Sequence, residues 1–454
     1  MNIAPYPTYQ PSGVEWLGNI PKDWSVKRLK WSVDGCFNGV WGDEPDGIDD
    51  VVCLRVADFN RDNYTISTEA LTLRAIEAKQ LESRKLKRGD LLIEKSGGGE
   101  KQLVGCVVYF DHEFDAVCSN FVARMPVAEG HLPRYWAYVH AGLYAGKLNY
   151  PAIKQTTGIQ NLDAALYLDT LAAYPPLAEQ QQIAAFLDWK TSQIDALIAK
   201  KQALLQKLKE KRLAVITQAV TKGLNPDAPM RDSGIAWLGK VPAHWGVKRL
   251  KFVAHVGNGS TPNREDSAYW DGGTYPWLNS SVVNQEQVTN ADQFVTPLAL
   301  SECHLPRISP PAVLVGITGQ GKTRGMATTL LFEATINQHL AYVKPDEAKA
   351  SVGFLRRVFD MAYAHLRIES ENGGSTKGAI TCEQIAELPI PVPPLDEQVV
   401  ISERIDMALA KLARMSDNAK SAITRLTEYR SAIITAATTG KIDVRSWQAP
   451  QETV

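Results

Sequence analysis

The sequence has few features that point to secretion, a membrane or a metal site. Its six cysteines are scattered over 454 residues, and none of them forms a Cys-x-x-Cys pair. We therefore expect free thiols in a reducing cytoplasm, with neither a disulfide framework nor a zinc site. No run approaches about 18 consecutive apolar residues, which argues against a membrane span. Residues 1–12 are rich in Pro and Tyr rather than basic, so no signal peptide is expected.

The sequence also lacks an excess of either charge sign. Lys and Arg number 49 against 50 Asp and Glu, a formal net charge of -1. A freestanding, non-specific DNA-binding protein is usually basic, so this class is disfavoured. The balance still allows local basic faces, or partners that supply the contacts to phosphate. The length and the 44% of hydrophobic residues are ordinary for a globular protein of roughly two to four domains.

Catalytic motifs are missing, apart from one misleading match. The Asn/Asp/Ser-Pro-Pro-aromatic motif of amino-methyltransferases is absent, and the histidines show no metal-binding spacing. Residues 316–323, GITGQGKT, match the phosphate-binding pattern G-x-x-x-x-G-K-[ST]. That pattern needs a helix beginning at its Lys-Thr pair, and residues 324–329 are a poor helix start. We expect no catalytic residue, metal or cofactor in this chain, and keep a P-loop ATPase-like enzyme as an alternative.

What the sequence does contain is an internal repeat. Residues 13–30 and 234–251 are identical at 11 of 18 positions, with an offset of 221 residues between Trp16 and Trp237. PPLAEQQQI at 175–183 returns as PPLDEQVVI at 393–401, an offset of 218. Two copies of so long a unit indicate a duplication, because a solenoid needs several short units.

The repeat divides the chain into conserved and variable stretches. The variable blocks are rich in Gly, Thr and β-branched residues, which predicts mixed α/β (α+β) globules with strands near 90–93, 104–110, 313–315 and 340–343. The predicted order is an N-terminal conserved segment (1–30), a first variable domain (31–173), a central helix (174–223), a repeat of the N-terminal segment (224–251), a second variable domain (252–391), a C-terminal helix (392–440) and a tail (441–454).

A long helix is predicted after each Pro-Pro-Leu. Pro and Gly are absent there for more than 40 residues, and Gly223 and Gly440 are suitable C-terminal stops. Apolar residues recur with the 4,3,4,3 spacing of a coiled coil, which favours an antiparallel pair with pseudo-twofold symmetry over two ordinary core helices. The predicted seam contains Leu187, Ile194, Ile198, Leu205, Leu208, Val215, Ile405, Leu409, Leu412, Ile423, Leu426 and Ile433.

Two similar domains on one helical spacer mirror the way a dimeric DNA-binding protein reads two half-sites. On a single chain, each domain can diverge and read a different sequence. Three motifs occur in pairs: the WLG.(I/V)P..W.VKRLK segments (16–30, 237–251), the PPL.EQ helix starts and the R.A.IT.A.T helix ends (from 212 and 430). The second variable block also contains GSTP (259–262) and NQHL (337–340). In this order they resemble the specificity subunits of Type I restriction-modification systems, over essentially the whole chain.

The resemblance implies two target-recognition domains that bind double-stranded DNA. It also implies two adenine-methyltransferase (modification) subunits docked on the helices, and restriction motor-nuclease subunits that join them. S-adenosylmethionine, ATP and Mg would be bound by those partners, in the cytoplasm of a bacterium or archaeon. The first block has FNGVWG (37–42) in place of Gly-x-Thr-Pro, so its loops are expected to read DNA differently. A coiled-coil scaffold that only joins proteins is a further alternative.

Candidate DNA contacts lie on Gly-rich and polar loops, because glycine lets backbone approach phosphate and Lys, Arg and Gln can reach phosphates or base edges. A hairpin that needs glycine only for its dihedral angles is the alternative for 95–102 and 318–324. Two further loops, 156–161 and 375–378, precede the return to the helices. The candidates, some of which are equally compatible with structural roles, are Lys95, Ser96, Lys101, Gln102, Asn120, Thr157, Gln160, Asn161, Gln320, Lys322, Thr323, Arg324, Gln338, His339, Thr376 and Lys377.

Overall fold

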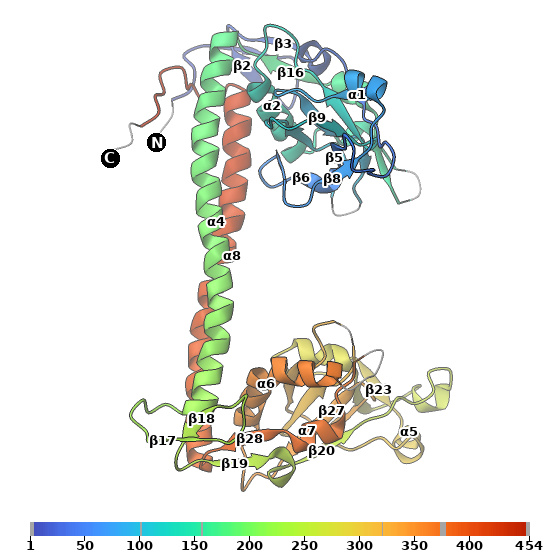
Figure 1. Ribbon diagram of the computed structural model, residues 1–454, viewed down its shortest axis with the longest axis vertical. Helices are drawn as coiled ribbons and strands as arrows, with labels where there is room; N and C mark the ends of the chain where they lie inside the picture. Colours follow the sequence, from blue (N-terminus) through green and yellow to red (C-terminus); the bar gives the residue numbers. More distant parts are fainter. Residues whose placement is uncertain (1–3, 100–101, 156–157, 320, 373–377, 451–454) are drawn as a thin grey trace. The chain divides into compact units, whose positions relative to one another are not determined.

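The chain divides into two compact units in a computed structural model that describes residues 4–99, 102–155, 158–319, 321–372 and 378–450. Unit 1 comprises Met1–Ala203 and Lys420–Val454, and unit 2 comprises Leu204–Ala419. Each unit therefore contains one variable block together with parts of both long helices (Figure 1).

The globule of unit 1 contains a four-stranded antiparallel sheet in the order β11-β9-β13-β4. A three-stranded sheet, β12-β5-β8, combines a parallel and an antiparallel pair. Helix α2 contacts β11, and its buried aromatic residues join the main core. The strands are β1 (Tyr9–Pro11), β2 (Asn19–Pro21), β3 (Ser25–Arg28), β4 (Phe37–Asn38), β5 (Val51–Leu54), β6 (Phe59–Asn60), β7 (Thr65–Ile66), β8 (Thr72–Arg74), β9 (Leu91–Glu94), β10 (Ser96–Gly97), β11 (Val107–Tyr109), β12 (Ala116–Cys118), β13 (Val122–Met125), β14 (Ile153–Gln155), β15 (Gln160–Leu162) and β16 (Leu171–Tyr174), and the short helices are α1 (Ala78–Arg84), α2 (Pro133–Ala145) and α3 (Ala164–Leu168).

The globule of unit 2 repeats this plan. The order β4-β13-β9-β11 returns as β20-β27-β24-β25, with β22 added at the edge, and β12-β5-β8 returns as β26-β21-β23 with the same parallel pair. Helix α6 contacts β24, β25 and β27. The elements are β17 (Met230–Asp232), β18 (Lys240–Pro242), β19 (Gly246–Arg249), β20 (Ala254–Asn258), β21 (Tyr275–Leu278), β22 (Gln287–Val288), β23 (Gln293–Val295), β24 (Ala312–Gly316), β25 (Ala327–Leu330), β26 (Thr335–Ile336), β27 (Leu340–Pro345), β28 (Pro389–Val392), α5 (Pro297–Glu302), α6 (Val352–Asn372) and α7 (Cys382–Glu387).

The conserved Trp/Pro segments have the same contacts in both units. The strand that contains Lys-Arg pairs with the strand just before Pro-Pro-Leu: β3 with β16, and β19 with β28. The Trp24 indole N–H donates to the Glu179 carboxylate at 2.7 Å, and Trp245 donates to Glu397 at 3.0 Å. Because both indoles are buried, the Glu of PPL.EQ satisfies a donor that water cannot reach.

The Gln of PPL.EQ is buried in both units and bridges the helix start to the globule. Gln180 accepts from the Leu132 backbone N–H at 3.0 Å and donates to the Pro175 carbonyl at 3.0 Å. Gln398 accepts from the Ser351 N–H at 2.8 Å and donates to the Pro393 carbonyl at 2.9 Å. The repeated motif therefore encodes a joint between the spacer and each variable domain.

Two long helices, α4 (Leu177–Lys222) and α8 (Leu395–Thr438), confirm the helical prediction. They pack antiparallel within each unit: the start of α4 shares a core with the end of α8 in unit 1, and the start of α8 with the end of α4 in unit 2. All twelve predicted seam residues are buried or half-buried. Gly223 and Gly440, with φ of +70° and +71°, follow the helix ends as expected for αL caps.

The buried stripe widens where each helix ends. Ile216 and Val220 are more deeply buried than the predicted seam residue Val215. At the same offset, Ile434 is more buried than Ile433. The reason is that each helix end packs against a globule as well as against the other helix.

The joint at Gln398 gives a stability prediction. Replacing Gln398→Leu removes an acceptor and a donor and leaves buried backbone groups without partners, so the free energy of unfolding of the chain is expected to fall by about 1–3 kcal/mol. Chemical denaturation followed by circular dichroism measures this loss. The control is Gln206→Leu on α4, where the amide is exposed and donates to Glu210 within the helix, and a change within about 0.5 kcal/mol is expected. Equal effects of the two substitutions would contradict the role of the joint.

Candidate nucleic-acid interface

Three candidate segments of unit 1 come together at one edge of the globule. Ser96 pairs with Asn161, and Gly97 with Gln160, in the β10–β15 ladder. The Lys95 backbone N–H donates to the carbonyl of Phe121 at 2.8 Å. The Gly-rich loop after β9, the turn between β12 and β13 and the loop before β15 therefore form one continuous surface.

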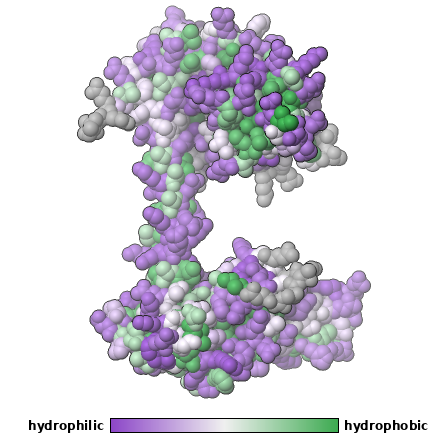
Figure 2. All heavy atoms as spheres, in the orientation of Figure 1, coloured by the Kyte–Doolittle hydropathy of each residue, from purple (hydrophilic) through white to green (hydrophobic). Residues whose placement is uncertain are grey.

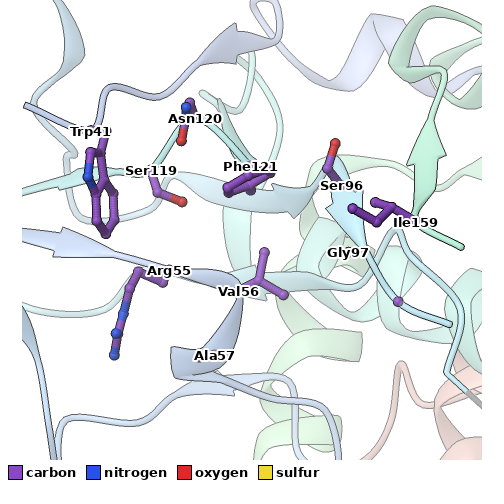
Figure 3. A pocket seen from close by; sticks show the side chains of 11 residues that line it. Trp41, Arg55, Val56, Ala57, Ser96, Gly97, Ser119, Asn120, Phe121 and Ile159 are labelled. Atoms are coloured by element: carbon purple, nitrogen blue, oxygen red, sulfur yellow. The ribbon is translucent and has the colours of Figure 1, made fainter. Parts of the chain in front are cut away.

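An open pocket lies in this surface, with a cavity volume of about 490 Å³. Figure 3 shows the side chains of Trp41, Val56, Phe121 and Ile159 around it, with Ser96, Ser119 and Asn120 among them. Gly97 and Gly98 contribute bare backbone. Two predicted residues, Ser96 and Asn120, thus lie beside apolar residues that were not among the candidates. The globule of unit 1 also carries an apolar area on the face seen in Figure 2.

Unit 2 brings the corresponding segments together. Thr318 forms a bridge with Ala379, and the Ile317 N–H donates to the His339 carbonyl at 3.0 Å. The side chains then form a hydrogen-bonded chain: Thr261 donates to Gln338, and the Thr318 hydroxyl lies 2.8 Å from His339 Nδ1. The predicted residues Gln338 and His339 are exposed on this surface.

Two of the candidates are buried, where they connect the loops. Gln160 is 4% exposed; it accepts from the Val104 N–H at 3.0 Å and donates to the Gly99 carbonyl. Arg324 is also 4% exposed and forms an ion pair with Glu371 at 2.7 Å. Gln160 and the Nη2 atom of Arg324 bond to protein groups rather than facing solvent. This placement favours a structural role for both, in place of the surface position expected from the sequence.

Charged groups beneath the unit 1 loop hold it in place. Glu94, at the end of β9, is fully buried and forms an ion pair with Arg61 at 2.9 Å. Burial raises the pKa of the Glu94 carboxyl, and the neighbouring Arg61 opposes that rise. With the Gln102 amide oriented so that its oxygen faces Arg61, the Arg61 Nε–H donates to that oxygen at 2.7 Å. Nearer the surface, Lys95 donates to Asn38. The Lys95 ammonium group has three N–H donors, and this bond to Asn38 engages one of them.

The other candidates divide into exposed residues and residues outside the described ranges. Lys101, Thr157, Gln320, Thr376 and Lys377 belong to the second group. Exposed or half-buried residues at the surface are Lys95, Ser96, Gln102, Asn120, Asn161, Lys322, Thr323, Gln338 and His339. The sequence analysis missed Trp41 and Phe121, although the offset of 218 places Phe121 at the position of His339, inside a motif that was recognised.

The P-loop-like sequence lacks the structure that nucleotide binding needs. After Lys322 and Thr323 the chain makes a turn and enters strand β25 at Ala327. A phosphate would therefore meet no helix N-terminus at this point. Within the described ranges, no group of three or more His, Cys, Asp or Glu side chains is placed to hold a metal ion. No helix in the described part of the chain has the length and apolar character to cross a membrane.

Comparisons with known proteins agree with this architecture. Residues 242–424 match the family model described as the Type I restriction modification DNA specificity domain. The chain is 23% identical over 435 residues to a candidate type I restriction enzyme specificity subunit, MjaX, of Methanocaldococcus jannaschii, covering 95% of this chain and 96% of that protein. It is 23% identical over 383 residues to the EcoKI specificity subunit of Escherichia coli K12, covering 81% and 78%.

Solved structures show the same fold. One, from work on complex assembly and conformational transition of the type I R-M system, has a TM-score of 0.69 at 16% identity and covers 92% of this chain and 98% of its own. The HsdS subunit from Thermoanaerobacter tengcongensis has a TM-score of 0.53 at 16% identity and covers 93% and 98%. The duplicated fold defines a class of two-domain proteins with long paired helices. Within that class, the chain is similar over most of its length to Type I restriction enzyme specificity subunits.

The different burial of Lys322 and Arg324 gives a prediction. Lys322→Ala removes an exposed cation, so the affinity for DNA is expected to fall. The slope of the logarithm of the DNA-binding constant against the logarithm of the salt concentration should shrink by about 1, and the free energy of unfolding should not change. Arg324→Ala removes a buried side chain that is paired with Glu371, so the free energy of unfolding should fall by about 1–3 kcal/mol. Fluorescence anisotropy across a salt series, with denaturation of the same samples, measures both. An unchanged slope for Lys322→Ala would remove this loop from the interface.

Proposed function

We propose that this chain is the DNA-reading subunit of a Type I restriction-modification complex, and that each variable block reads one half of an asymmetric, bipartite target. The observation that supports this most directly is the repeated surface. In both units, backbone hydrogen bonds connect three segments: a loop after the central strand, a turn before the next strand and a loop before the spacer. Such loops on a rigid frame can present donors and acceptors to base edges.

The side chains on this common frame differ between the units, as two different half-sites require. Unit 1 presents Trp41 and Phe121 where unit 2 presents Thr261 and His339. A scaffold that only joined proteins would have no need for two matched surfaces of different chemistry. In this proposal the continuous helices α4 and α8, about 1.5 Å long per residue, set the gap between the half-sites.

Recognition and catalysis are divided between subunits in this proposal. The chain contributes sequence specificity and no catalytic group, and two adenine-methyltransferase subunits dock on it to modify one adenine in each half. Restriction motor-nuclease subunits join the same complex. S-adenosylmethionine, ATP and Mg are bound by those partners, and the complex acts in the cytoplasm, where host and invading DNA meet. The turn after Lys322 disfavours ATP binding at the P-loop-like sequence of this chain.

Methylome sequencing of a host that lacks other systems tests the proposal. The chain is expressed with its cognate modification subunit, and an asymmetric bipartite motif with an unspecified gap and one methyladenine per half is expected. Replacing residues 31–173 by the corresponding block of another specificity subunit should then change one half and leave the other half and the gap unaltered. If an intact complex adds no methylation, or if the replacement alters both halves, the proposal fails and the scaffold alternative gains.

A further inference from the structure

The pocket of unit 1 is an apolar part of the surface that we propose reads DNA. Trp41, Val56, Phe121 and Ile159 give it apolar walls, and Phe121 remains 55% exposed. Trp41 is held in place, because the Arg74 guanidinium lies 4.5 Å from its ring centroid and donates to its carbonyl at 3.3 Å. Arg55, also at the pocket, has its charge engaged by Asp58 at 3.0 Å. Phosphate is therefore a poor match for the interior of this pocket.

The corresponding position of unit 2 is polar. Strand pairing aligns Asn38 with Ala123 in unit 1 and Asn258 with Ala341 in unit 2, so Trp41 corresponds to Thr261. The turn that follows aligns Asn120 and Phe121 with Gln338 and His339 at the offset of 218. Thr261, Gln338 and His339 take part in the hydrogen-bonded chain of unit 2. At Trp41 and Phe121, the apolar character of the walls is thus a property of unit 1 and not of the shared fold.

A buried hydroxyl in the same pocket lacks a partner. Ser119 is 1% exposed and lines the pocket, and among the described residues its Oγ has no hydrogen-bond partner. Figure 3 shows this side chain between Trp41 and Phe121. A buried hydroxyl without a partner is costly, and a ligand that supplies an acceptor would remove that cost. The pocket therefore suits a group that is apolar at one point and carries a hydrogen-bond acceptor beside it.

We propose that this pocket reads a thymine in the major groove of the half-site that residues 31–173 recognise. The proposal rests on the DNA-reading function proposed above. On the edge of thymine, the C5-methyl group lies next to the O4 acceptor, and this methyl is the apolar group that a base edge presents in the major groove. The methyl group enters between Trp41 and Phe121, and rotation of the Ser119 side chain toward the pocket that it lines lets its hydroxyl donate to O4. Asn120, exposed at the rim, is the residue type that pairs with adenine N6 and N7.

Replacing thymine by deoxyuridine tests this without altering the protein, since uracil keeps the pairing and O4 and lacks only the methyl group. The full chain in complex with its modification subunit is titrated with the duplex identified by its methylome, with each thymine replaced in turn. One position in the first half should lose about fourfold in affinity, the loss expected for one buried methyl group. Thymines of the second half serve as the matched control, with losses below about twofold.

Protein variants then assign the loss to the pocket. Phe121→His and Trp41→Thr install the residues that unit 2 carries at these places, and both side chains are exposed enough for the core to tolerate the change. Each variant should bind the thymine and uracil duplexes with equal affinity. The control is Ile48→Thr, which changes an apolar residue that is 73% exposed and does not line the pocket, and it should preserve the difference.

Four outcomes would overturn the proposal. Full affinity with uracil at every thymine of the first half, while specific binding persists, removes the methyl contact and leaves the DNA-reading function intact. Equal losses in both halves, or a thymine preference that survives Phe121→His and Trp41→Thr, place the contact elsewhere. Absence of specific binding to any bipartite duplex would overturn the DNA-reading function itself, and this inference with it.

Discussion

The apolar stripes of α4 and α8 must be buried, and this requirement organises both units. Within each unit the stripes meet antiparallel, and the start of one helix and the end of the other share a core with a globule. Apolar burial alone would not position the globules on the helices. The buried Gln180 and Gln398 do so, because each forms hydrogen bonds with backbone groups of its own globule and of the Pro-Pro-Leu motif. The repeated Pro-Pro-Leu motif thus fixes each globule on the helices.

The fold conserves what is buried and varies what faces outward. Gly39 and Gly259 lie at corresponding strand ends, and a Cβ there would fall 2.0 Å from the Cys118 carbonyl oxygen and 1.8 Å from that of Ile336. Only glycine permits this close approach, so both blocks keep it although their sequences have diverged. Two residues further on, Trp41 and Thr261 face the reading surface and differ completely. One backbone frame can therefore support two chemistries, apolar in unit 1 and polar in unit 2.

The long helices, their seam and their glycine stops could be predicted because periodicity and capping are local signals. The positions of the strands could be predicted from the sequence, but their ends could not. Within the predicted run 104–110, for example, the strand is β11, Val107–Tyr109. The reading surface itself could not be predicted, because Ser96 and Asn161 meet through a ladder between distant segments. Polar residue type also does not reveal burial, so Gln160 and Arg324 were grouped with surface candidates. Trp41 and Phe121 were missed because large aromatic side chains more often belong to a core.

The central claim is that the two variable blocks are independent readers on one common frame. The most direct test is the methylome of a chain in which residues 252–391 are replaced by a second copy of residues 31–173, expressed with the modification subunit. Two identical readers should produce a motif whose two halves are identical, with the native gap between them. An intact complex that still methylates the native asymmetric motif would contradict the account, because specificity would then lie outside the variable blocks.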